Sequence, residues 1–192
     1  MNTLSKPLTN RLWLVVGANA SAMLELIARL SLKKPGDACS VRVMDGGNQF
    51  NAYTVARSIG RQMAQAERGP GYDSLSLGEA LRRIHLSRAF TCYQMVTLLE
   101  ETPLDATPTC LLDLLSNFYD EAIRLEESQR LLGLCLAAIR RLSHQAPVVI
   151  SLRPAGPRHA DRACLVELLR AAADEVWEQE GVLAPPSPQP WW

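Results

Sequence analysis

The 192-residue sequence lacks the features that mark several functional classes. Its 20 lysine and arginine residues balance its 20 aspartate and glutamate residues, so no overall electrostatic field attracts nucleic acid or a membrane surface. No apolar stretch is long enough to span a bilayer, and the apolar run near the N-terminus is shorter than a signal peptide requires. We therefore expect a cytoplasmic protein without a membrane partner.

Paired metal ligands are also missing. The five cysteines form no C-x-x-C pair, and the three histidines are widely separated along the chain. A zinc site needs such pairs, so the sequence predicts no metal site. An odd number of cysteines, most of them within apolar runs, instead indicates buried reduced thiols, which agrees with a cytoplasmic location.

What the sequence does contain is a regular alternation of short apolar runs and amphipathic helical segments. The runs predict strands at residues 12–16, 41–45, 84–88, 109–115, 147–152 and 175–178. This alternation predicts an α/β fold, a three-layer sandwich with a mainly parallel central sheet. We expect one domain over residues 11–183, between a polar lead at 1–10 and a proline-rich tail at 184–192. For Trp191 and Trp192 in that tail, docking on a partner, docking on this domain and disorder all stay open.

The first strand, a glycine turn and a helix follow the frame of a phosphate-binding loop, G-x-x-x-x-G-K-[ST]. Gly17 fits the first glycine, whereas Ala22, Met23 and Leu24 replace the second glycine, the lysine and the hydroxyl residue. Losing two or three charge-assisted hydrogen bonds would weaken binding by about 4–8 kcal/mol. ATP and magnesium are therefore expected to bind weakly if at all. A plain strand-turn-helix packing unit is the alternative interpretation.

Five segments in order resemble the core of RecA-type recombinases, in the style of the archaeal RadA and KaiC-like branch. Residues 41–50 are similar to the strand ending in D-T-E-G-T-F, residues 84–99 to the segment with A-x-x-x-x-Q-M, and residues 109–113 to the Walker B strand. Residues 126–142 are similar to the helix that follows the Walker B strand. Residues 148–154 are similar to the strand that leads to the second DNA-binding loop. The resemblance implies a RecA-like P-loop NTPase fold and a role in DNA recombination or repair.

This sequence differs from that family at the positions of the family's catalytic residues. The acid that activates water is replaced by Gly47, and the polar sensor after the fifth strand reads Leu152-Arg153. Of the usual set, Asp45 and Asp113 remain, and two carboxylates without phosphate contacts would hold magnesium weakly. Both acids could instead hydrogen-bond the ends of neighbouring strands. We predict no catalytic residue and a degenerate nucleotide site, that of a pseudo-ATPase, at Gly17, Ala22, Met23, Leu24, Asp45, Gly47 and Asp113.

Basic residues follow the fifth strand, where the resemblance places a loop that contacts single-stranded DNA. They are Arg153, Arg158, His159 and Arg162. Arginines among proline and glycine suit phosphate contacts, but the loop has no aromatic residue for base stacking, so a solvated basic loop is the alternative. Phe118 and Tyr119 fall where the first DNA loop would begin, and they could stack on bases or belong to the core.

Taken together, the sequence predicts a non-catalytic RecA-like domain that acts as a binding or accessory module. Its expected partner is a protein, either a recombinase or a second copy of this chain, with single-stranded DNA as a further candidate ligand. Two alternatives stay open. One is a weak ATP-binding protein or ATPase that uses the degenerate loop, and the other is a homo-oligomeric structural protein without a ligand.

Overall fold

The computed structural model describes residues 11–17, 20–32, 40–66, 75–153 and 156–178. The predicted lead and tail, including Trp191 and Trp192, lie outside this set. The described residues form a six-stranded sheet of order β3-β2-β4-β5-β1-β6 in which every pairing is parallel. Its strands are β1 (Leu12–Val16), β2 (Val41–Asp45), β3 (Ile84–Arg88), β4 (Thr109–Leu112), β5 (Val148–Leu152) and β6 (Glu175–Glu178). The predicted α/β class with a parallel central sheet is confirmed.

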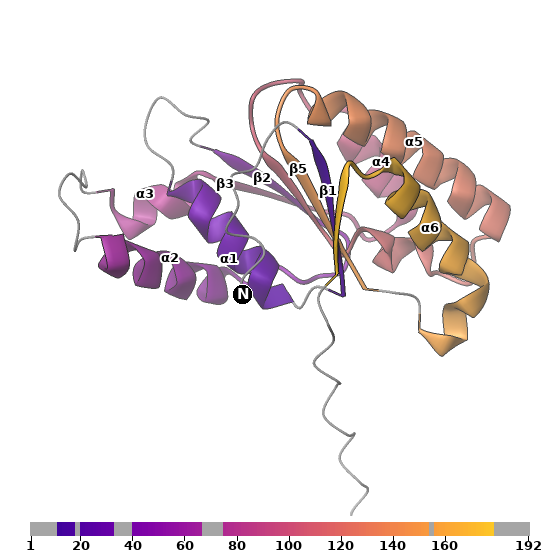
Figure 1. Cartoon of the computed structure of the whole chain (residues 1–192), viewed down its shortest axis with the longest axis horizontal. Helices are drawn as coiled ribbons and strands as arrows, with labels where there is room; N and C mark the ends of the chain where they lie inside the picture. The colour runs from indigo at the N-terminus through magenta and orange to yellow at the C-terminus, as the bar shows by residue number, and fades with distance from the viewer. Residues whose placement is uncertain (1–10, 18–19, 33–39, 67–74, 154–155, 179–192) are drawn as a thin grey trace, which may run out of the picture.

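Helices cover the sheet on both sides, as Figure 1 shows. On one face lie α1 (Ala20–Ser31), α2 (Ala52–Ala66) and α3 (Leu77–Arg82). On the other lie α4 (Cys92–Glu100), α5 (Leu125–Ser143) and α6 (Ala163–Ala172). None of the helices in the described residues is long and apolar enough to cross a membrane.

Strand β1 explains why both faces are covered. All five of its side chains are buried, and alternate ones point to opposite faces of the sheet. Leu12, Leu14 and Val16 join the core under α4, α5 and α6, whereas Trp13 and Val15 join the core under α1 and α2. A strand that is apolar at every position needs a layer on each side, which is typical of parallel sheets.

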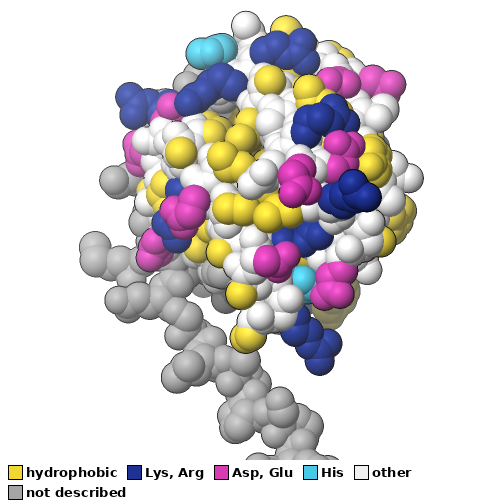
Figure 2. All heavy atoms as spheres, turned by 90° about the vertical axis from the view of Figure 1, so that its right-hand side faces the viewer, with side chains coloured by type: hydrophobic (Ala, Val, Ile, Leu, Met, Phe, Trp, Pro, Cys, Tyr) yellow, Lys and Arg dark blue, Asp and Glu magenta, His cyan; other side chains and the backbone are white. Residues whose placement is uncertain are grey.

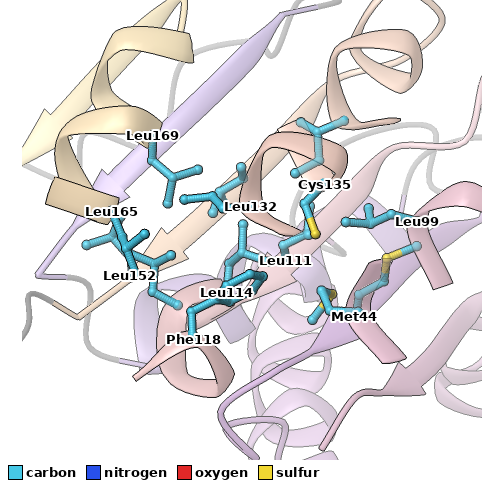
Figure 3. Packing of buried hydrophobic residues seen from close by; sticks show 14 of the residues in the cluster. Met44, Leu99, Leu111, Leu114, Phe118, Leu132, Cys135, Leu152, Leu165 and Leu169 are labelled. Atoms are coloured by element: carbon cyan, nitrogen blue, oxygen red, sulfur yellow. The ribbon is translucent and has the colours of Figure 1, made fainter. Parts of the chain in front are cut away.

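The larger core lies between the sheet and the α4–α6 layer. Figure 3 shows Met44, Leu111 and Leu152 of the sheet packed against Leu99, Cys135 and Leu165 of the helices. The same cluster contains Phe118, which is fully buried. Phe118 is therefore a core residue, and its ring is not available for stacking on a base.

The strand predicted at residues 109–115 is shorter in the structure. Strand β4 ends at Leu112, and Asp113 adopts a left-handed backbone conformation with φ of 51°. A 3₁₀ helix, η2 (Leu114–Phe118), follows at once. The apolar residues of η2 are buried. Their sequence pattern therefore resembles that of a buried strand, although their backbone forms a 3₁₀ helix. This turn fixes where the Asp113 side chain lies.

The four described cysteines are free, and three of them, Cys92, Cys110 and Cys135, are buried. Burial raises the pKa of the Cys110 and Cys135 thiols to about 12, so both are protonated near neutral pH. This agrees with the prediction of buried thiols at these positions. Cys39 lies outside the described residues.

The strand order excludes one common class of nucleotide-binding fold. In the doubly wound dinucleotide-binding and flavodoxin-like sheets, the first strand lies beside the second. Here β1 lies between β5 and β6, while β2 lies between β3 and β4. The connection after β1 therefore crosses two strands before the chain re-enters the sheet.

Candidate functional site

The predicted site residues follow four neighbouring strands of the sheet, β2, β4, β5 and β1. Asp45 ends β2, while Asp113, Arg153 and Gly17 directly follow β4, β5 and β1. Because the strands are parallel, these residues share one edge of the sheet. From this edge β1 and β2 lead to helices on one face, and β4 and β5 lead to helices on the other (Figure 1). Such divergence is where α/β sheets bind ligands.

The predicted phosphate-binding frame starts at Gly17, directly after β1, and continues into helix α1. Gly17 has a φ of 72°, and its N–H donates to the carbonyl of Leu152 at 3.0 Å. Helix α1 already begins at Ala20, two residues before Ala22, which stands at the position of the second glycine. The position of the second glycine in the predicted frame therefore lies inside helix α1.

Met23 and Leu24, at the lysine and hydroxyl positions, point into the protein. Met23 is fully buried and Leu24 nearly so, both in the core beneath α1. Substituting lysine for Met23 would place a charge in an apolar core and would not restore a phosphate contact.

The carboxylate of Asp45 holds the loop after β2. Its two oxygens accept hydrogen bonds from the backbone N–H groups of Gln49 at 2.9 Å and Phe50 at 2.8 Å. Arg88 of the neighbouring strand lies 3.7 Å from the same carboxylate, which is buried. Asp45 therefore has a structural role, since its oxygens already have partners.

Asp113 is paired with Arg153. The Arg153 backbone N–H donates to Oδ1 of Asp113 at 3.2 Å, and the guanidinium donates to Oδ2 through Nε at 2.8 Å and also through Nη2. The Asp113 side chain is 4% exposed and that of Arg153 is 59% exposed. Both oxygens of this buried carboxylate therefore accept hydrogen bonds from Arg153.

Gly47 fits this arrangement because it has no side chain. A Cβ atom on Gly47 would lie 2.4 Å from Oδ2 and 2.6 Å from Cβ of Asp113. Such distances are far below van der Waals contact, so the Asp113 side chain fills the space that a residue at position 47 would need. The acid that the family resemblance expects at this position has no room while Asp113 stays paired with Arg153.

Tyr119 contacts the backbone of Arg153, the partner of Asp113. Its hydroxyl donates to the carbonyl of Arg153 at 3.2 Å, and its ring stacks on His159 with centroids 5.6 Å apart. Burial, with a smaller contribution from the negative charge of Asp113, raises the pKa of Tyr119 to about 12. The phenol therefore remains protonated and holds the backbone of the loop after β5.

The structure places the predicted basic residues in different environments. Arg162 is 4% exposed, and its guanidinium donates to the carbonyls of Phe118 and Ile123 and to the hydroxyl of Ser128. Nδ1 of His159 lies 3.7 Å from Glu121, and Arg153 is paired as described. Arg158 is exposed. Arg162 therefore cannot contact a phosphate without leaving its place in the fold.

Sequence reasoning missed the pairing of Asp113 with Arg153. The two residues are 40 positions apart in the sequence. The sequence does show an acid and an arginine that each directly follow a predicted strand. These two side chains can pair only if β4 and β5 are neighbours in the sheet, which the sequence pattern does not establish.

Neither a metal centre nor a known family accounts for this edge. Within the described ranges, no group of three or more histidine, cysteine, aspartate or glutamate side chains is placed to hold a metal ion. Comparison with known proteins finds no family model that matches the chain and no curated protein that is similar to it.

Proposed function

We propose that this chain is a RecA-like domain without nucleotide chemistry that acts as a binding or accessory module. The observation that carries this proposal is the pairing of Asp113 with Arg153 above Gly47. Asp113 and Asp45 are the two acids that could serve a nucleotide-bound cation, and both oxygens of each accept hydrogen bonds within the chain. The side chains of Asp113 and Arg153 thus occupy the part of the sheet edge where the family resemblance implies a nucleotide site.

Phosphoryl transfer depends on positioning the phosphates and on stabilising their charge. At this edge the lysine position is a buried methionine, Met23, and the position of the water-activating acid is Gly47. These features support a pseudo-ATPase over the alternative of a weak ATP-binding protein or ATPase.

Exposed aromatic side chains support a protein as the partner. Tyr53, in the first turn of α2, is 72% exposed, and Phe90, just after β3, is 71% exposed. Tyr93 in α4 is half exposed. Aromatic residues are enriched where proteins bind one another and are costly to leave in water. We propose a recombinase or a second copy of this chain as the partner, and a role in recombination or repair follows from the resemblance alone.

Single-stranded DNA is the less supported ligand. Of the predicted contact residues, Arg162 is buried and Arg153 is neutralised by Asp113, which leaves Arg158 as the exposed arginine without a described ion pair. Figure 2 shows acidic and basic side chains interspersed on the face that carries α5 and α6. One phosphate contact would give binding that falls only about threefold between 50 and 200 mM salt.

The proposal is tested by measuring binding of the purified chain to the RecA-type recombinase of its own organism, and to itself, by sedimentation and calorimetry. We expect the double variant Tyr53→Ser with Phe90→Ser to weaken the interaction at least tenfold. Leu134→Ser, which changes an exposed leucine on α5, is the matched control and should have no effect. ATP hydrolysis that is lost in Asp113→Ala would overturn the proposal.

A further inference from the structure

We draw no further inference here: the strongest candidate, the outer edge of strand β3 with the exposed side chains of Leu86 and Phe90 beside it, carries nothing because no contact in the described part of the chain shows what covers it.

Discussion

The guanidinium of Arg153 lies against the buried carboxylate of Asp113, and this contact joins the ends of the two central strands β4 and β5. The Arg153 backbone N–H also donates to Asp113, so the acid fixes both the side chain and the main chain of its partner. A buried carboxylate is costly unless it is paired and hydrogen-bonded. The pair is therefore a structural requirement of this edge, and it can be tested by removing either member.

Replacing the arginine should destabilise the protein. In Arg153→Met the Asp113 carboxylate stays buried and keeps only the backbone N–H of residue 153. We expect the free energy of unfolding to fall by about 1–3 kcal/mol, because breaking a buried pair leaves an uncompensated charge, and solvent near the exposed arginine reduces the loss. Urea unfolding at neutral pH measures the change. Arg158→Met, at an exposed position of the 3₁₀ helix η3 (Pro157–Arg162), is the control and should change stability by less than about 0.5 kcal/mol. Equal effects of the two substitutions would contradict the account.

Adding one methyl group at position 47 should be harmful. The new Cβ of Gly47→Ala would lie 2.4 Å from a side-chain oxygen of Asp113, so we expect a loss of about 1–3 kcal/mol from overpacking. Gly60→Ala is the matched control, because Gly60 is inside helix α2 and its new Cβ would meet no atom within 4 Å beyond its chain neighbours and the adjacent helix backbone. That substitution should stabilise the protein by about 0.5–1 kcal/mol.

A double-mutant cycle identifies the cause of the Gly47→Ala effect. Asp113→Gly removes the whole side chain, which is necessary because Cβ of Asp113 would itself lie 2.6 Å from the new methyl group. Glycine also suits the positive φ at position 113. In the Asp113→Gly background, Gly47→Ala should cost at least about 1 kcal/mol less than in the native protein. Additive effects would show that the two positions are not in contact.

Arg162 should behave as a core residue despite its charge. Its guanidinium satisfies two backbone carbonyls and the Ser128 hydroxyl, so Arg162→Met would leave buried acceptors without donors. We expect a loss of about 2–4 kcal/mol. Arg162→Lys should recover little of it, because one ammonium cannot reproduce the fork of donors. Thermal and urea unfolding measure the change, and full stability of Arg162→Met would remove the structural role assigned to this residue.

Stability at acidic pH should depend on Asp174. The Leu12 backbone N–H, and then Arg140, lower the pKa of Asp174 in the folded protein. A carboxyl group whose pKa is lower when folded stabilises the fold above its unfolded pKa of about 3.9, and this stability is lost as the pH falls through the folded value. Asp174→Asn should therefore be less stable than the native protein at pH 6 and lose less stability below about pH 4. The exposed Asp161→Asn is the control, and the same pH profile in both variants would contradict the assignment.

The fold was largely predictable because strands and helices leave a periodic pattern of apolar residues. Ile84–Arg88 and Glu175–Glu178 are strands as predicted, although both lie at the edges of the sheet and are only partly buried. The strand predicted at 109–115 is longer than β4, because the apolar residues of η2 are buried although they belong to a 3₁₀ helix and not to the strand. Hydrophobicity reports burial and does not distinguish a strand from a short buried helix.

The site was less predictable because it depends on which strands are neighbours. The sequence pattern indicated that Asp45, Asp113 and Arg153 follow strands, but it could not place β4 beside β5 or show that Arg153 neutralises Asp113. Likewise, nothing in the spacing of Arg162 distinguishes a buried arginine that holds carbonyls from an exposed one that contacts phosphate. Such assignments require the partners of each side chain, which only the three-dimensional arrangement provides.

The most direct test of the central claim is isothermal titration calorimetry of the purified chain with ATP and magnesium, with Arg153→Ala measured in parallel. We expect no saturable heat for either protein up to millimolar nucleotide, because Met23 and Gly47 supply no contact even when Asp113 is released. Micromolar binding by the native chain, abolished by Asp113→Ala, would contradict the account.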